Sequence, residues 1–225
     1  MLKGAFFFGG RGEAPYPEVT KIVKEGNINY VLWGKEVPNS FTRTYQNICE
    51  APNYHKNKLD FSKFTKIGQN NFNDFSLVLV APGMTELNLK SLQTLGATCF
   101  NDLSGDIKTL KAPLLREVDD SFSTTALTKI DAPLLETVKN TCFSNNPSVV
   151  NDFTFPSLHT ILGQGNFCNL SNVYYLTMRK LVQISAPNNF KRLASLSQIV
   201  VSAGIDSASE FRLKSGVGAS KIRKV

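Results

Sequence analysis

The sequence predicts a mainly β fold: a solenoid with coils of about 23 residues, short parallel strands and an N-terminal cap. Three observations predict it. Pairs of apolar residues three positions apart recur along the chain, every second pair carries a third apolar residue two positions further on, and a phenylalanine closes each group of two pairs. The repeat is clearest in IKTLKAPLLREVDDSF at 107–122 and LTKIDAPLLETVKNTCF at 127–143.

The spacing of the apolar pairs defines the period. The first residues of successive pairs lie alternately 15 and 8 positions apart, with one shortened gap of 12. These residues are Leu92, Ile107, Leu115, Leu127, Leu135, Val150, Leu158, Val173, Leu181 and Leu196. The phenylalanines that follow are Phe100, Phe122, Phe143, Phe167 and Phe190. This regularity indicates stacked coils, because one coil cannot bury its apolar side alone.

The longer group of each coil predicts a short strand. Ile130 and Ala132 are two positions apart, so they face the same side of an extended chain. Leu127 precedes Ile130 by three positions, a spacing that a straight strand does not allow, so we expect the chain to bend inward there. Pro113 and Pro133 follow the third apolar position, where a strand would leave its ladder.

The period divides the chain into three segments. Residues 1–56 lack it and are predicted to be an N-terminal capping or docking segment, residues 57–201 form the solenoid, and residues 202–225 are a basic C-terminal extension. The net charge of +7 lies at this end: residues 1–177 carry 16 Lys/Arg and 16 Asp/Glu, whereas residues 178–225 carry nine and two. A neutral body with a basic end favours a flexible or docking tail.

The pattern L-x-x-I-x-A-P, followed by a second apolar pair and a phenylalanine, resembles the BspA-type leucine-rich repeat over residues 57–201. Leu115 and Leu135 stand where ordinary leucine-rich repeats have an asparagine. The resemblance implies a curved right-handed solenoid that binds proteins or surfaces rather than catalysing a reaction. Such repeats are common in surface adhesins of gut bacteria and look like pieces found in phages that infect them.

Little in the sequence points to catalysis, a cofactor or a metal. His55 and His159 have no partner at the spacing of metal ligands. Cys99 and Cys142 each precede a repeat phenylalanine and are expected to be buried, which leaves Cys168 with His159 as the nearest candidate for a catalytic pair. We therefore expect a non-enzymatic protein without a cofactor.

The N-terminus carries no segment typical of export. Its compact apolar run, at 5–8, is shorter than the roughly 7 to 15 residues of a signal peptide's apolar region. No run reaches the roughly 18 apolar residues of a membrane helix. We expect a protein made in the cytoplasm, with a virion as the alternative location, and no membrane insertion.

The outward side of the predicted strands is the candidate ligand-binding face. Residues between the apolar positions should point outward in every coil, up to Gln198 and Val200. Two adjacent tyrosines in VYYLTM favour binding, because exposed aromatic residues are enriched in interface hot spots. The candidate residues are Lys111, Lys129, Asp131, Asp152, Tyr174, Tyr175, Thr177 and Gln198. An ordinary solvated strand face is the alternative interpretation.

The basic end supplies a second candidate surface, for docking. Its residues are Arg212, Lys214, Lys221, Arg223 and Lys224. We expect the main partner to be a protein or a cell-surface ligand. Two alternatives stay open: a structural component of a virion or other large assembly, anchored by its termini to other subunits, and, more weakly, nucleic-acid binding by the basic end. No aromatic residues alternate with the final basic residues, which disfavours single-strand recognition.

Overall fold

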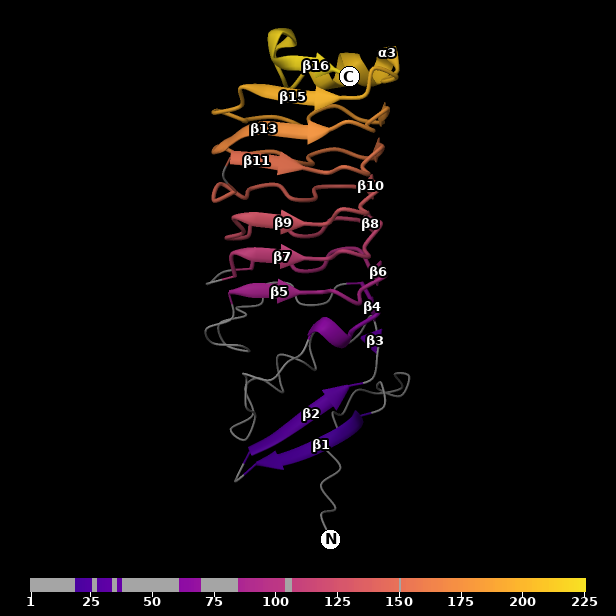
Figure 1. Cartoon of the computed structure of the whole chain (residues 1–225), viewed down its shortest axis with the longest axis vertical. Coiled ribbons are helices and arrows are strands. Elements are labelled where there is room, and N and C mark those ends of the chain that lie inside the picture. Colours follow the sequence, from indigo (N-terminus) through magenta and orange to yellow (C-terminus); the bar gives the residue numbers. More distant parts are fainter. Residues whose placement is uncertain are drawn as a thin grey trace, which may run out of the picture.

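The computed structural model describes residues 19–25, 28–33, 36–37, 61–69, 85–103, 107–149 and 151–225. From residue 61 onward they form a stack of coils (Figure 1). Each coil contributes one strand to each of two columns, and all strands within the columns are parallel. The prediction of a mainly β solenoid of short parallel strands is confirmed.

The first column, here named the long-strand column, runs along one side of the stack. Its strands are β5 (Glu86–Asn88), β7 (Thr109–Lys111), β9 (Lys129–Asp131), β11 (Asn151–Thr154), β13 (Val173–Met178), β15 (Gln198–Val201) and β16 (Ile222–Lys224). Paired residues of adjacent coils lie 23 positions apart, as Tyr175 and Gln198 do. The coil between Thr109 and Lys129 spans 20 positions because its second half is shortened, and Asn151 pairs with Val173, 22 positions away, at a register shift.

The second column consists of two-residue strands on another side of the coils. They are β3 (Glu36–Val37), β4 (Lys66–Ile67), β6 (Thr94–Leu95), β8 (Glu117–Val118), β10 (Thr137–Val138), β12 (Thr160–Ile161) and β14 (Gln183–Ile184). Before it, β1 (Val19–Glu25) and β2 (Ile28–Trp33) form an antiparallel hairpin. Most of the predicted N-terminal cap lies outside the described residues, so its boundary at residue 56 stays a prediction.

The strand patterns follow from the apolar spacing. Leu127, Ile130 and Ala132 are all buried, while Lys129 and Asp131 between them are exposed. Alternation on a strand thus sends every second side chain into the coil. The corresponding residues of each coil pack on their neighbours and make one continuous core, as the repeat requires.

The third side of each coil has an alternating backbone. Asp120, Phe122 and Thr124 have φ values of 42°, 60° and 51°, in the left-handed region that residues other than glycine seldom adopt. With this conformation, backbone N–H groups of one coil reach both the preceding and the following coil. Phe122 N–H donates to the Cys99 carbonyl of the preceding coil, and Thr124 N–H donates to the Ser144 carbonyl of the following one. Hydrogen bonds in both directions offset the conformational cost.

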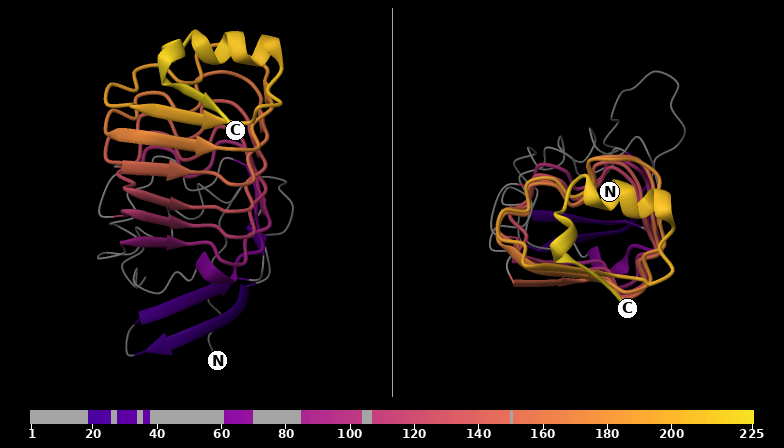
Figure 2. Two further views of the ribbon diagram at one scale, coloured as in Figure 1. Left: turned by 45° about the horizontal axis from the view of Figure 1, so that its top comes forward. Right: turned by 90° about the horizontal axis from the view of Figure 1, so that it is seen from above.

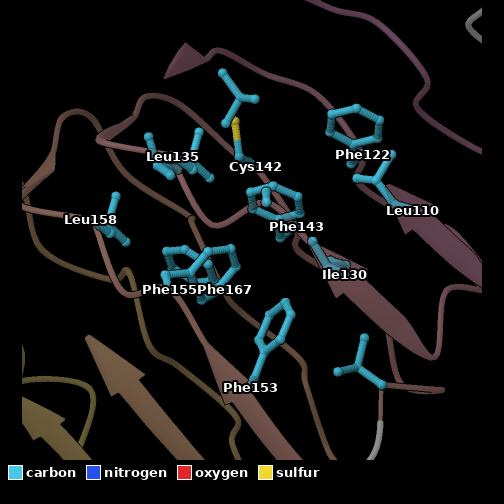
Figure 3. Close-up of a cluster of buried hydrophobic side chains, with 14 of the residues drawn as sticks. Leu110, Phe122, Ile130, Leu135, Cys142, Phe143, Phe153, Phe155, Leu158 and Phe167 are labelled. Atoms are coloured by element: carbon cyan, nitrogen blue, oxygen red, sulfur yellow. The ribbon is translucent and has the colours of Figure 1, made fainter. Parts of the chain in front are cut away.

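The repeat phenylalanines stack on one another in the core. Phe122 lies 5.7 Å from Phe143 between ring centroids with planes 6° apart, and Phe167 and Phe190 repeat this arrangement at 5.7 Å and 3°. All five repeat phenylalanines are at most 1% exposed. Figure 3 shows Phe143 among aromatic and aliphatic side chains from several coils. The predicted core position of these residues is confirmed.

Buried asparagines tie the coils together beside the stack. Asn146 is fully buried, and its Oδ1 accepts hydrogen bonds from the N–H and hydroxyl groups of Thr125 in the preceding coil. Its Nδ2 donates to the carbonyls of Phe122 and Ser144. Asn101, Asn166 and Asn189 make similar bonds between or within coils. All polar atoms of the buried Asn146 side chain are therefore satisfied.

Residues 202–225 fold over the last coil. Helix α3 (Ser207–Lys214) lies across the end of the stack, and η3 (Ala219–Lys221) leads into β16, which extends the long-strand column (Figure 2). Leu213 and Val217 are buried there. These apolar residues add to the core, so the segment is part of the folded stack, and of the predicted flexible or docking tail the docking role stays a prediction. We call residues 202–225 the C-terminal cap.

Candidate binding face

The long-strand column places most of the predicted ligand-binding residues in two adjacent lines on one face. In the first, Asp152, Tyr175 and Gln198 lie in direct register on β11, β13 and β15. In the second, Lys111 pairs with Asp131 on β7 and β9. Thr177 continues this second line on β13, between Thr154 and Val200. Neighbouring parallel strands lie about 4.8 Å apart, so one partner could contact several coils at once.

Tyr174 and Tyr175 are the most exposed aromatic residues of this face, each 48% exposed. Adjacent strand residues normally point to opposite sides. Here the register of β11 with β13 shifts between Asn151 and Asp152, which leaves Tyr174 without a paired residue on β11. The two residues between the first and second apolar positions are at least partly exposed in other coils as well, as Thr128 and Lys129 are. Both tyrosines consequently reach solvent at the same point of the face.

Ion pairs occupy part of the face. Lys111 Nζ lies 2.7 Å from Glu86 Oε2 on the preceding strand. The Lys111 charge is therefore already partly neutralised within the chain, so Lys111 is less available to bind a ligand. Lys129 and Asp131 are exposed, and no ion pair involving either is found in the described part of the chain. They remain candidates for polar contacts with a ligand.

Val200 differs from the prediction. It follows the outward line of the face but is only 7% exposed, whereas an outward residue was expected to meet solvent. In the ladder it lies between Thr177 on β13 and Arg223 on β16. The added strand of the C-terminal cap thus covers a position that would otherwise be at the edge. The open part of the face ends near Gln198.

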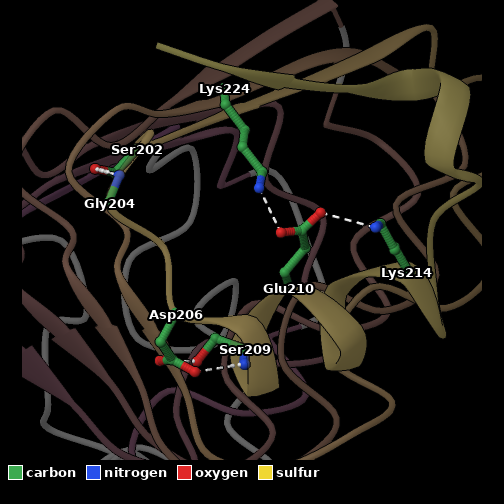
Figure 4. A network of polar contacts seen from close by, with 7 residues as sticks. All are labelled: Ser202, Gly204, Asp206, Ser209, Glu210, Lys214 and Lys224. Atoms are coloured by element: carbon green, nitrogen blue, oxygen red, sulfur yellow. Dashed lines mark hydrogen bonds and ion pairs between the residues drawn. The ribbon is translucent and has the colours of Figure 1, made fainter.

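The predicted docking residues divide between structural and free positions. Arg212 Nη1 donates to the Ile184 carbonyl at 2.6 Å. Glu210 forms ion pairs with Lys214, at 2.7 Å, and with Lys224 (Figure 4). The two lysines also donate hydrogen bonds to the Glu210 carboxylate, and these bonds hold its pKa below the ordinary value. The bond from Lys214 has the larger effect, followed by that from Lys224. Three of the five residues therefore hold the cap together.

Lys221 and Arg223 are the two basic residues that remain. No hydrogen bond or ion pair of their side chains is found within the described residues, and Arg223 is exposed on the last strand.

Asp206, the other carboxylate of the cap, is engaged at the N-terminus of α3. It accepts hydrogen bonds from the hydroxyl and the N–H of Ser209, at 2.6 and 2.8 Å, and these lower its pKa.

Comparison with known proteins identifies the repeat. The model of the BspA type leucine rich repeat region matches residues 93–212, in six copies. The chain belongs to this family. The BspA-type repeats suggest a protein-binding module, since such a solenoid is typically a scaffold for binding rather than catalysis. No curated protein and no solved structure matches the chain.

The cysteines of the BspA-type coils serve the core. Cys99 and Cys142 are fully buried, as predicted. Burial also raises the pKa of the Cys168 thiol, which donates to the Asn188 carbonyl at 2.8 Å, while His159 Nδ1 contacts the Thr160 hydroxyl. The structure therefore does not support the Cys168–His159 pair. Within the described ranges there is no group of residues that could hold a metal ion and no helix that could span a membrane.

The predicted repeat did not include β16, which belongs to the long-strand column. A signal was present, because Ile222 lies 23 residues after Ile199 and pairs with it. The third apolar position holds Lys224, and the first holds the small Ala219, which hid the repeat. As a result Arg223, assigned to a separate docking surface, lies at the end of the same column as Thr177.

Proposed function

We propose that this BspA-type chain is a non-enzymatic binding module that presents its long-strand face to a protein or cell-surface ligand. The observation that supports this most is the exposure of Tyr174 and Tyr175 side by side on a stacked ladder. Tyrosine offers a large contact area at a low cost in conformational entropy, and it is enriched in interface hot spots. Asp152 and Gln198 flank Tyr175 in direct register and would supply hydrogen bonds.

The rigidity of the ladder supports the same proposal. Each strand of the face pairs in parallel with at least one neighbour, in the sheets β5-β7-β9 and β11-β13-β15-β16, and its inward residues belong to the continuous core. A surface that is already ordered loses little conformational entropy when it binds. Adhesion to a cell surface would use this property directly.

A display library of genomic fragments from the source organism and its neighbours tests the proposal. Binders selected with the unmodified chain are measured against Tyr174→Ala/Tyr175→Ala, with Leu114→Ala as the control at an exposed apolar residue outside the proposed surfaces. We expect the double substitution to weaken the selected binders at least tenfold and the control to change affinity less than twofold. Binders that keep full affinity for the tyrosine variant would refute the proposed face.

A structural role in a virion or another large assembly is the second candidate. Phe211 favours it, because this side chain is 75% exposed on α3 at the end of the stack, where another subunit could cover it. Size-exclusion chromatography with light scattering distinguishes the two: a binding module elutes as a monomer, whereas an assembly component is recovered with other chains. Nucleic-acid binding is weaker, since three of the five basic residues of the cap have internal partners.

A further inference from the structure

The outer edge of β16 is an open strand edge on the last coil. Val225 N–H donates to the Val201 carbonyl at 3.0 Å, and the Val225 carbonyl accepts from Ala203 N–H at 2.7 Å. Backbone groups of alternate residues point to opposite sides of a strand, so the N–H and carbonyl of Lys224 point away from β15. No described residue pairs with this side of β16. The ladder can therefore accept one more strand.

The charge around this edge is positive. The cap has five Lys/Arg and two Asp/Glu, and both carboxylates are engaged inside it, Asp206 at the start of α3 and Glu210 between two lysines. Lys221 precedes the edge strand and Arg223 lies on it, and neither has an acidic partner in the described part of the chain. An incoming strand would therefore be attracted if it carried carboxylates.

The side chains of β16 specify where an incoming strand needs apolar and acidic residues. Ile222 continues the inward line of Ile199 and is only partly buried, so an apolar residue beside it would extend the core. Arg223 continues the outward line of Val200, so an acidic residue beside it would form an ion pair across the strands. The fitting sequence thus alternates apolar and acidic residues.

We propose that β16 is a docking site for an extended acidic segment of a partner protein, which adds to the ladder as the next strand. Main-chain hydrogen bonds would supply affinity, and the alternating side chains would supply specificity. A second copy of the chain fits poorly, because both ends would bring the same basic strand together, and basic residues on an edge oppose such self-pairing. This proposal is independent of the long-strand face.

A fluorescent VEVEVEV peptide tests the proposal by anisotropy with the full chain, and VKVKVKV is the control peptide. We expect saturable binding of the acidic peptide only. Arg223→Glu should weaken it at least tenfold, whereas Lys108→Glu, at an exposed position far from the cap, should change it less than twofold. Tyr174→Ala/Tyr175→Ala should leave this binding unchanged, so failure of the face and failure of the edge can be told apart.

The comparison of Lys224→Pro with Lys224→Gln isolates strand addition. Both substitutions remove the ion pair with Glu210, but only proline removes the outward backbone N–H of residue 224. The backbone hydrogen bonds of Val225 to Val201 and Ala203 do not use this N–H, so the proline leaves them in place. We expect the proline variant to bind the peptide at least fivefold more weakly than the glutamine variant. Equal affinities would overturn strand addition. So would tighter binding of a 20-nucleotide DNA than of the peptide, or self-association of the chain that Lys224→Pro abolishes.

Discussion

At the scale of single residues, buried polar side chains hold the coils together as the apolar core does. Asn146 bridges two coils because its buried amide accepts from Thr125 and donates to the Phe122 and Ser144 carbonyls. A buried polar group that loses its partner costs about 1–3 kcal/mol. The phenylalanine side of the coil consequently depends on asparagine for its geometry.

Asn146→Ala is expected to lower the free energy of unfolding by about 3 kcal/mol, because it leaves buried N–H and carbonyl groups unsatisfied. Urea denaturation followed by circular dichroism measures the change. Asn172→Ala is the control: this asparagine is exposed and makes one hydrogen bond, to the Pro147 carbonyl at 2.6 Å, so its loss should cost under about 1 kcal/mol. Equal losses in the two variants would contradict the bridging role.

The thiols should differ in reactivity according to burial. Burial raises the pKa of the Cys142 thiol and also that of Cys168, which is less completely buried. A raised pKa lowers reactivity because the thiolate is the reactive form. Iodoacetamide at pH 8, with peptide mass spectrometry, should therefore modify Cys168 slowly and modify Cys99 and Cys142 only after unfolding. Rapid labelling of Cys142 in the folded chain would show that its coil opens.

At the scale of elements, the C-terminal cap combines a helix and a strand to close the stack. Asp206 caps α3 through Ser209, and Glu210 joins the helix to β16 through Lys224. Both carboxylates have a pKa below the ordinary value in the folded chain. Their contribution to stability is thus fully present above the ordinary carboxylate range and is lost as pH falls through the folded-state pKa values.

Asp206→Asn should therefore make the cap less dependent on pH. At pH 6 the charged aspartate accepts from Ser209 and favours the N-terminus of α3, so the native chain should exceed the variant in stability. As the pH falls to 3 the difference should shrink, because protonation removes the advantage of aspartate. Hydrogen exchange of the α3 amides at the two values provides the measurement. A constant difference would exclude this carboxylate as the cause.

The elements also show what the sequence could predict. The apolar period was sufficient to place Ile130, Phe143 and their counterparts in the core, because burial depends on a pattern visible along the chain. The neutralisation of Lys111 by Glu86 could not be predicted, since it depends on the register between coils 23 residues apart. Val200 was misplaced for a related reason: the strand that covers it comes from a cap whose repeat holds a lysine at one apolar position and a small alanine at another.

At the scale of the whole molecule, each coil contacts mainly its neighbours, so stability is expected to be a sum of coil and interface terms. The face and the cap are then two surfaces of one rigid stack. Tyr174 and Tyr175 lie at its side, and Lys221 and Arg223 lie at its end. A partner could occupy either surface without disturbing the other, which is why the proposed experiments separate them.

The central claim, that coils stack in sequence order with one phenylalanine on the next, is tested most directly by double-mutant cycles of Phe→Leu substitutions. Phe122 and Phe143 stack in adjacent coils, whereas the coil of Phe143 lies between those of Phe122 and Phe167. We predict a coupling energy of about 0.5–1.5 kcal/mol for the adjacent pair and additivity within about 0.5 kcal/mol for the separated pair. Additivity in both pairs, or equal coupling in both, would contradict the stacked arrangement.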